Sequence, residues 1–346
     1  MKPRTQPAKL TSAFTITRAM LMAAGLGTRL RPFTDQMPKA LLPLLGVPMA
    51  QFAVDALSAA GVKKIVANVH HHADRARAGL ESLELAAAEL VISDESDCLL
   101  GSAGGLKKAL VHFGDEPFFL LNADVIFDVD LGALAKRHAE LRSERGVVLT
   151  LAVFMRGPAG AKYREIHLDQ KSGLINGFGE LVAERPYFVG AAVIEREALA
   201  EVPEELTAEF VPQVLAPAIQ AGKAGAFVTS GLWHDVGTPE LWLDAHLAMI
   251  ERLESGNLMT GFRSRIEEHS QRVGPGIWIA KNSSRGIGAV RWTGPCYWDG
   301  LGASSAPPRS FGPRAVLYGS SKAVSDPSTL SGGIGYCGLW VSQKSG

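Results

Sequence analysis

The fold is decided by one stretch, MLMAAGLGTRLRP at residues 20–32, which is followed by Pro38-Lys39. Its apolar start predicts a buried strand, and Gly25 and Gly27 end that strand two positions apart. Glycine lets the backbone approach an anion closely, so that successive N–H groups can point at it. Two arginines and the lysine add positive charge to the same loop. The stretch therefore predicts a strand that leads into a phosphate-binding loop.

Two common phosphate-binding motifs do not fit this loop. The third glycine of the dinucleotide fingerprint is replaced by Leu30, and no Gly-Lys-Ser/Thr follows as in a Walker A loop. A plain strand-to-helix turn would leave the cluster of three cations unexplained. The loop is therefore interpreted as a phosphate site of another kind.

Bulk properties describe a globular protein of about two domains, because 346 residues exceed what one core usually supports. The formal net charge is zero, which gives no sign of a nucleic-acid or membrane partner. No segment has the roughly 20 apolar residues of a membrane helix. Cys98, Cys296 and Cys337 form no CxxC pair, so we expect free thiols and a cytoplasmic location.

Residues 1–17 are interpreted as a flexible leader, and residues 18–255 alternate between strand and helix patterns. The predicted strands include Ala19–Ala23, Lys64–Val69, Leu90–Ser93, Pro117–Asn122 and Val147–Phe154. The predicted helices include Pro48–Ala60, Ala73–Leu83, Gly101–Val111, Leu131–Arg142, Leu206–Gln220 and one that Thr238 caps. Such alternation predicts an α/β fold with a doubly wound, mostly parallel sheet, whose ligands bind at the carboxyl ends of the strands. Residues 161–194 are expected to be an insertion of short strands that covers the sheet.

The composition shifts after Gly256 to glycine, serine, proline and tryptophan, and long helical patterns stop. Apolar residues six apart, such as Val273 and Ile279, together with Gly-Pro turns, favour short coils of a parallel β-helix. The alternative is an irregular glycine-rich β tail.

Two carboxylates lie where strands end. Asp124 closes an apolar strand as Asn122-Ala123-Asp124, and Asp235 lies in Trp233-His234-Asp235-Val236-Gly237. Mg²⁺ beside a polyphosphate takes one or two carboxylates together with phosphate oxygens and water. The run His70-His71-His72 is a weaker metal candidate, because adjacent side chains of a strand point to opposite faces. It is interpreted as a polar turn.

Together these residues resemble the sugar-1-phosphate nucleotidyltransferases, also called nucleotide-sugar pyrophosphorylases. The family signature A-[AG]-G-x-G-T-R-[LMF]-x-P-x-T, followed by P-K, is matched in full by residues 23–34 and Pro38-Lys39. Leu100–Gly105 resembles the second nucleotide-binding loop of that family. Asn122–Asp124 and Trp233–Thr238 resemble its two metal-binding motifs. The resemblance covers about residues 18–255, and residues 256–346 are similar to the left-handed β-helix that several members append.

The resemblance implies a reaction in which a sugar 1-phosphate attacks the α-phosphate of a nucleoside triphosphate and pyrophosphate leaves. It also implies roles for individual residues. Nucleotide binding falls to Ala23, Gly25, Gly27, Thr28, Ser102 and Gly104; catalysis to Arg29 and Lys39; Mg²⁺ binding to Asp124 and Asp235; and the sugar phosphate to Glu180 and Gly190.

One departure from the family concerns the sugar phosphate. Many members carry F-x-E-K-P, whose lysine contacts that phosphate, whereas residues 178–182 read FGELV. Glu180 is retained, but Leu181 stands at the position of the lysine. Either another cation, among Lys162, Arg164 and Arg185, meets the sugar phosphate, or the sugar site is altered.

Several functions stay open on this sequence. The tail favours a mannose- or heptose-1-phosphate guanylyltransferase that supplies cell-envelope polysaccharide synthesis. N-acetylmuramate-1-phosphate uridylyltransferases also lack the lysine motif but have no such tail. A non-catalytic regulatory paralogue that binds nucleotide-sugar is disfavoured, because the signature residues are intact. A tail that transfers acyl groups is disfavoured, because the tail has no obvious catalytic histidine and its only histidine, His269, lies near its start. The tail is instead expected to form a homo-oligomer contact.

Overall fold

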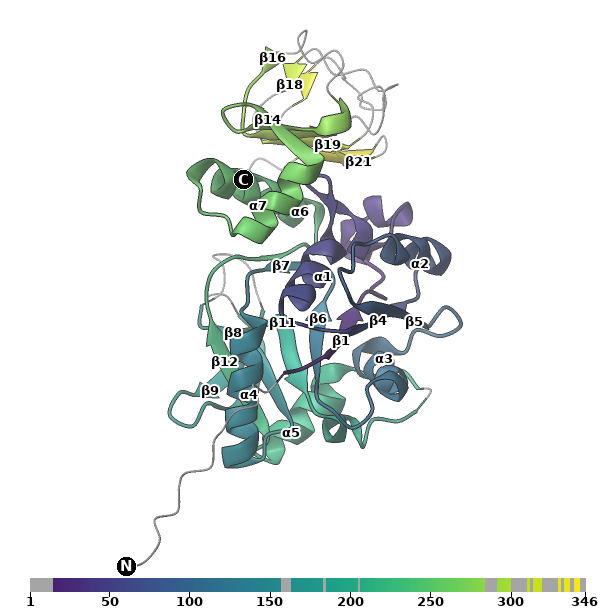
Figure 1. Ribbon diagram of the computed structural model, residues 1–346, viewed down its shortest axis with the longest axis vertical. Coiled ribbons are helices and arrows are strands. Elements are labelled where there is room, and N and C mark those ends of the chain that lie inside the picture. The colour runs from purple at the N-terminus through teal and green to yellow at the C-terminus, as the bar shows by residue number, and fades with distance from the viewer. Residues whose placement is uncertain are drawn as a thin grey trace, which may run out of the picture.

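The computed structural model describes residues 15–156, 163–182, 185–204, 206–283 and 291–299, and beyond these 310–311, 314–318, 329–330, 333–336 and 339–342. A nine-stranded sheet with the order β5-β4-β1-β6-β11-β8-β12-β10-β9 forms its centre (Figure 1). The strands are β1 (Arg18–Met22), β4 (Lys64–Val69), β5 (Glu89–Asp94), β6 (Phe118–Asn122), β8 (Leu149–Phe154), β9 (Tyr163–Asp169), β10 (Leu174–Val182), β11 (Tyr187–Ile194) and β12 (Ala224–Thr229).

Helices cover both faces of this sheet. Successive side chains of a strand point to opposite faces. Ala19 and Leu21 accordingly enter one apolar core, which they share with α1 (Met49–Ala59), α2 (Ala73–Glu81) and α4 (Leu131–Arg145). Met20 enters a second core, shared with α3 (Gly101–Ala109) and α5 (Ala216–Gln220). The predicted α/β fold is confirmed, and it explains why the central strands are apolar throughout.

The prediction that residues 161–194 form an insertion covering the sheet is wrong. Strands β9, β10 and β11 belong to the main sheet, and β11 lies at its centre, antiparallel to both β6 and β8. Its sequence YFVGAAVI is apolar along its whole length, as a strand buried on both faces requires. The prediction of one helix over 206–220 also needs correction. Helical structure begins only with a π-helical turn at Val211–Leu215, which continues into α5.

Helix α6 (Pro239–Ser255) begins as predicted. The Thr238 hydroxyl accepts a hydrogen bond from the Leu241 N–H at 3.3 Å, and Pro239 occupies the first helical position. The expectation that long helices end at Gly256 is wrong, because α7 (Thr260–His269) follows. Its sequence TGFRSRIEEH carries only Phe262 and Ile266 as buried positions, so its apolar pattern is short.

Two small sheets follow α7. One is a mixed, six-stranded sheet with the order β14-β15-β17-β19-β21-β22, called the C-terminal sheet below. The other is a parallel, three-stranded sheet of β16, β18 and β20. The bounds are β14 Ser270–Gly274, β15 Ile277–Ala280, β16 Arg291–Trp292, β17 Cys296–Asp299, β18 Ser310–Phe311, β19 Ala315–Tyr318, β20 Thr329–Leu330, β21 Gly333–Tyr336 and β22 Leu339–Ser342.

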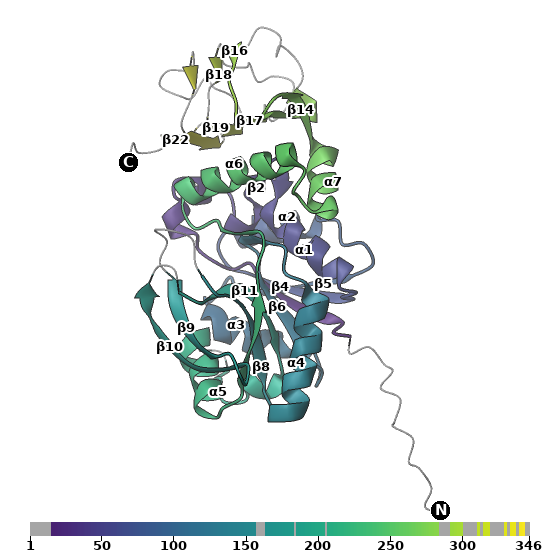
Figure 2. The same cartoon turned by 90° about the vertical axis from the view of Figure 1, so that its left-hand side faces the viewer.

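Helix α6 lies between the C-terminal sheet and the rest of the molecule (Figure 2). A third apolar core passes through this layer. It includes Leu30 and Phe33 of the predicted phosphate-binding loop, residues 23–39, which is called the glycine loop below. Phe33 contacts Trp242 of α6 edge-on, with ring centroids 5.3 Å apart, and Trp242 stacks on Tyr318 at 5.9 Å. The Trp242 indole N–H donates to the Pro43 carbonyl at 2.9 Å, at the start of the hairpin of β2 (Pro43–Leu44) and β3 (Val47–Pro48). The glycine loop and the C-terminal sheet thus share one core.

A buried polar contact crosses the same layer. His246 of α6 contacts the Trp242 carbonyl through Nδ1 at 2.8 Å and the Tyr318 hydroxyl through Nε2 at 2.7 Å. The Tyr318 hydroxyl also accepts from the Gly46 N–H at 3.3 Å, in the turn between β2 and β3. Burial lowers the pKa of His246 to about 3, so the imidazole is neutral in the folded protein at neutral pH.

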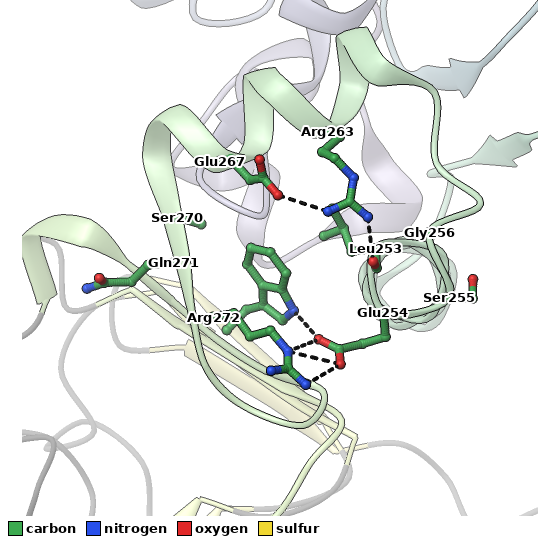
Figure 3. A pocket seen from close by; sticks show the side chains of 10 residues that line it. Leu253, Glu254, Ser255, Gly256, Arg263, Glu267, Ser270, Gln271 and Arg272 are labelled. Atoms are coloured by element: carbon green, nitrogen blue, oxygen red, sulfur yellow. Dashed lines mark hydrogen bonds and ion pairs between the residues drawn. The ribbon is translucent and has the colours of Figure 1, made fainter.

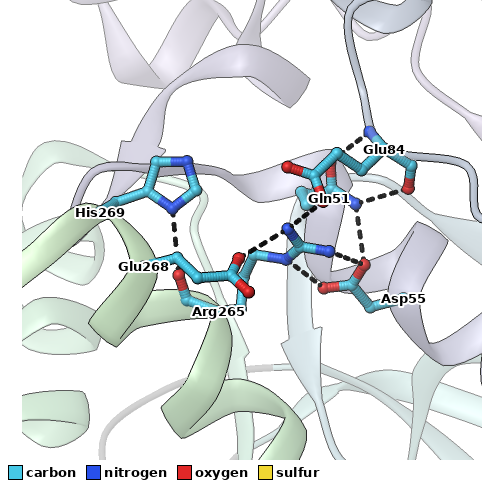
Figure 4. Close-up of polar contacts among 6 residues, drawn as sticks. All are labelled: Gln51, Asp55, Glu84, Arg265, Glu268 and His269. Atoms are coloured by element: carbon cyan, nitrogen blue, oxygen red, sulfur yellow. Dashed lines mark hydrogen bonds and ion pairs between the residues drawn. The ribbon is translucent and has the colours of Figure 1, made fainter.

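Helix α7 is attached to α1 by charge (Figure 4). Nε and Nη2 of Arg265 donate to the two carboxylate oxygens of Asp55 at 2.9 and 3.0 Å, and Nη1 donates to Glu84 at 2.6 Å. The Arg265 side chain is only 14% exposed. Bidentate pairs of arginine and carboxylate are among the stronger hydrogen bonds, so this contact fixes α7 against the body of the protein.

A cavity of about 630 Å³ lies where α6, α7 and β14 meet (Figure 3). Its charged groups pair with one another: Glu254 accepts two hydrogen bonds from Nε of Arg272, a third from Nη2, and one from the Trp278 indole at 3.0 Å. None of the site residues predicted from the sequence lines this cavity. It is part of the junction between α6 and the C-terminal sheet.

The buried His246 makes a prediction about stability and pH. In the unfolded chain its pKa lies near 6.5, so between about pH 6.5 and pH 3 only the unfolded state binds this proton. As the pH is lowered through that window, this one group should reduce the free energy of unfolding by about 1.4 kcal/mol for each pH unit. Urea unfolding of wild type and His246→Gln at about pH 7 and pH 5 should show the steeper loss in wild type. Equal losses would contradict this assignment.

Candidate active site

The glycine loop leaves β1 as an open backbone turn. The N–H groups of Ala23 and Ala24 donate to Oδ1 of Asn68 at 2.8 and 3.3 Å. Gly25 has no atom within 4 Å of the position that a Cβ would take, which leaves an approach to the backbone free. Gly27 has a φ of 61°, and a Cβ there would lie 2.7 Å from Cγ2 of Thr34. Glycine is therefore required at 27 by both conformation and space.

Two short strands bring the predicted carboxylates together. β7 (Val125–Phe127) and β13 (Trp233–Asp235) pair antiparallel, with Asp235 opposite Val125. The Val236 N–H donates to the Asp124 carbonyl at 3.2 Å. The two aspartates, more than a hundred residues apart in sequence, thereby lie at the same edge of the sheet.

The two predicted catalytic cations lie beside these carboxylates. Nζ of Lys39 contacts Oδ2 of Asp124, and the lysine side chain is only 10% exposed. The Arg29 guanidinium lies against Gly237, with Nη2 3.0 Å from the position of a Cβ there. Burial and the charge of Asp124 raise the pKa of Asp235, while Lys39 and Arg29 oppose the rise. The four side chains therefore form one electrostatic cluster.

The residues in this cluster fit a divalent cation. Mg²⁺ in phosphate sites takes one or two carboxylates and completes its shell with phosphate oxygens and water. Asp124 and Asp235 supply such a pair, and a cation there would oppose the burial and the repulsion by Asp124 that raise the pKa of Asp235. Within the described residues no group of three or more metal-binding side chains is present.

The second loop, Leu100–Gly105, contacts residues 206–210, and the sequence did not predict this contact. The Ser102 hydroxyl donates to Glu209 at 2.7 Å and accepts from the Phe210 N–H at 2.8 Å. The N–H groups of Ala103 and Gly104 donate to the Ala208 carbonyl at 2.8 and 3.2 Å. A Cβ at Gly104 would lie 2.7 Å from the Leu206 carbonyl oxygen. Residues 206–210 thus lie directly against the start of α3.

The two residues predicted for the sugar phosphate differ in their placement. Gly190 has a φ of 89° within a register shift of β11, and a Cβ there would lie 3.2 Å from Nδ2 of Asn122. It therefore lies beside the Asn122–Asp124 segment. Glu180 is exposed on β10, and Leu181 is 58% exposed.

Two of the three alternative cations already have partners in the β9–β10 region. Nη1 of Arg164 donates to the Gly179 carbonyl at 3.2 Å, and its guanidinium lies 5.4 Å from the centre of the Phe178 ring. Arg185 lies 3.9 Å from Glu165. Lys162 falls outside the described residues.

The three histidines have different hydrogen-bond environments, although the rings of His71 and His72 lie 4.0 Å apart. Nδ1 of His70 contacts the Glu95 carbonyl at 2.6 Å, and Nε2 of His71 contacts the Thr34 carbonyl at 3.1 Å. Nε2 of His72 is buried without a hydrogen-bond partner in the described residues. The three imidazoles therefore do not converge on one point.

Three residues near the site carry no motif and were not predicted from the sequence. Tyr163 stacks on Tyr187 with ring centroids 4.9 Å apart, and burial and the charge of Asp235 raise its pKa to about 12. Asn68 and Glu95 connect the two loops, as described below. Both could have been noticed as polar residues at the ends of apolar strands, where a buried position needs a hydrogen-bond partner.

Comparison with known proteins decides the family. A family model described as Nucleotidyl transferase matches residues 18–252. The chain belongs to this family. It is 33% identical over 239 residues to the N-acetylmuramate alpha-1-phosphate uridylyltransferase of Caulobacter vibrioides, a match that covers 67% of this chain and 97% of the relative. It is 27% identical over 290 residues to the probable mannose-1-phosphate guanylyltransferase 3 of Oryza sativa subsp. japonica, covering 79% and 77%.

Solved structures agree on the fold. HddC from Yersinia pseudotuberculosis matches with a TM-score of 0.56 at 20% identity, covering 68% of this chain and 100% of that one. The inositol-1-phosphate CTP transferase from T. maritima matches with a TM-score of 0.54 at 19% identity, covering 73% and 96%. The family model and the sequence relatives confirm the predicted sugar-1-phosphate nucleotidyltransferase family, and the protein is an enzyme of that class. No helix among the described residues is both long and apolar enough to cross a bilayer.

Separate replacement of the two aspartates tests their assignment. Asp124→Asn and Asp235→Asn should each lower the rate about 100-fold or more. Each change removes a negative charge that would hold Mg²⁺ beside the phosphates. Both variants should also need more Mg²⁺ for half-maximal rate. The matched control is Asp115→Asn, which changes a fully exposed carboxylate before β6, at the opposite edge of the sheet. Wild-type rates in both site variants would reject the assignment.

Proposed function

We propose that this protein transfers a nucleotidyl group from a nucleoside triphosphate to a sugar 1-phosphate, releasing pyrophosphate and an NDP-sugar. The observation that carries the proposal is the contact of Lys39 with Asp124, beside Asp235 and Arg29, at the open end of the glycine loop. This cluster combines two cations for phosphates with two carboxylates for a metal.

The reaction needs positioning and charge rather than a general base. The attacking oxygen of a sugar 1-phosphate is already ionised, so the enzyme has to hold two anions in line and neutralise charge that develops on the α-phosphate. Ala23, Gly25, Gly27 and Thr28 present backbone and hydroxyl groups to the triphosphate. Arg29 binds the departing pyrophosphate. When bound, Mg²⁺ held by Asp124 and Asp235 supplies Lewis-acid stabilisation of the phosphate oxygens.

Lys39 is proposed to meet the sugar phosphate in place of the lysine that Leu181 replaces. Its Nζ contacts Asp124 and so lies within the charge cluster, whereas Arg164 and Arg185 contact groups of the β9–β10 region. Gly190 packs closely against Asn122 and Val125, and its backbone is proposed to face the bound sugar at this point. Glu180, on β10, is proposed to contact the sugar hydroxyls.

The preferred substrates are mannose 1-phosphate and GTP. The support is the set of relatives named mannose-1-phosphate guanylyltransferases, such as that of Aspergillus oryzae, 30% identical with 77% of this chain covered. The second candidate is N-acetylmuramate 1-phosphate with UTP. It is favoured by the 33% identity to a uridylyltransferase whose length is almost fully matched.

Residues 256–346 are proposed to form a C-terminal domain in which the strands after α7 build a short β-helix-like part with an oligomer contact. Cys296 pairs with Ala315, and Ala315 with Gly333, as parallel neighbours in the C-terminal sheet. The strands of the three-stranded sheet alternate with these along the chain and also pair in parallel. Such alternation is what successive coils of a β-helix would give. The body of the enzyme would then be residues 18–255.

A pyrophosphate-release screen tests the proposed reaction. The four common ribonucleoside triphosphates and dTTP are combined with a panel of sugar 1-phosphates that includes mannose and N-acetylmuramate, with Mg²⁺ or with EDTA. We expect release with at least one pair, abolished by EDTA and by Arg29→Ala. Turnover with GTP and mannose 1-phosphate supports the first candidate, and turnover with UTP and N-acetylmuramate 1-phosphate the second. Nucleotide binding without turnover on any pair would favour a regulatory protein.

A further inference from the structure

We propose that Asn68 and Glu95 are positioning residues that hold the glycine loop and the second nucleotide-binding loop in a fixed relation, so that both can contact one nucleotide. The inference rests on the proposed function, which assigns the triphosphate to the glycine loop. It extends that function to the second loop, where the resemblance places Ser102 and Gly104 for binding of the same nucleotide. Neither side chain belongs to the cluster of Arg29, Lys39 and the two aspartates.

Asn68 connects the glycine loop to β4. It is 1% exposed in the otherwise apolar run Ile65–Val69. Its Oδ1 accepts hydrogen bonds from the N–H groups of Ala23 and Ala24, the first two residues after β1. Its Nδ2 donates to Oε1 of Glu95 at 2.8 Å. The amide therefore uses its acceptor side for one loop and its donor side for the carboxylate.

Glu95 continues the connection to the second loop. It is 2% exposed, and its Oε2 accepts from the Leu100 N–H at 3.4 Å, one residue before α3. A Cβ at Gly105 would lie 2.6 Å from Oε1 of Glu95 and 2.9 Å from Nδ2 of Asn68. Gly105 is therefore the residue that lets α3 pack onto this pair.

Burying this polar pair is energetically unfavourable, and a role in positioning the two loops explains its presence. Burying a carboxylate is unfavourable, and burial raises the pKa of Glu95 while hydrogen bonds from Asn68 and Leu100 hold it down. Apolar residues would fill the same space without that cost. The pair gives each hydrogen bond a defined donor and acceptor. In the wild type, these match because residue 68 is an amide and residue 95 is a carboxylate.

This directionality permits a test by exchange. In Asn68→Asp two carboxylates face each other, and in Glu95→Gln one side of the new amide faces a donor, either the Asn68 amide or the Leu100 N–H. The double variant restores every match: the introduced aspartate accepts from Ala23, Ala24 and the introduced glutamine amide, whose oxygen accepts from Leu100. We expect each single variant to raise KM for the triphosphate at least 10-fold, with KM for the sugar 1-phosphate and kcat changed less than about 3-fold. The double variant should return to within about 3-fold of wild type.

Two further readouts separate positioning from stability. Calorimetric binding of the triphosphate found in the screen should show the same pattern of loss and recovery, and Asp115→Asn is the matched control. If both single variants lose stability but bind nucleotide as wild type does, the pair is only structural and the proposal is overturned. The same holds if the double variant folds and binds no better than the singles. Should Asn68→Asp not fold, Glu95→Gln and the double variant still make the comparison. A wild type that binds nucleotide without turnover would reject the proposed function, while the binding series would still test this pair.

Discussion

The structure depends on the apolar support beneath the glycine loop. The loop backbone forms three short 3-10 turns, at Thr28–Leu30, Phe33–Asp35 and Lys39–Leu41. In the described part of the chain, the backbone-to-backbone hydrogen bonds of these turns are local, so side-chain packing has to fix their position on the protein. Here Leu30 and Phe33 anchor it from below, and both are fully buried against the layer formed by α6. Trp242 contacts Phe33 on one side and Tyr318 on the other. The loop is therefore held by residues from two distant parts of the chain, α6 and β19.

Charge at the site is balanced rather than merely gathered. Two carboxylates at one sheet edge would repel each other, and the raised pKa of Asp235 reflects burial and that repulsion. Lys39 and Arg29 oppose it from the glycine loop. The apolar support and the charge cluster are thus linked, because the residues between Gly27 and Lys39 contribute to both. A change in the core below the loop would move the cations above it.

Local patterns were enough for most elements of the main sheet. Strand β4 was predicted to the residue, and the capped start of α6 was predicted because Thr238 and Pro239 act over neighbouring residues. The errors concern non-local choices. No local feature says that β11 pairs between β6 and β8 rather than in a separate layer. Likewise, residues 206–210 have a helix-like composition, but the start of α3 competes successfully for their backbone.

The site shows the same division between local and distant information. Gly27, Lys39, Asp124 and Asp235 lie in short motifs whose chemistry can be read from adjacent residues. Asn68 and Glu95 carry no motif, and their meaning depends on which strands are neighbours. Once β1, β4 and β5 are known to be adjacent, a buried asparagine and a buried glutamate at their carboxyl ends have to satisfy each other or the loops. Parallel order alone thus turns two isolated polar residues into a connection between the loops.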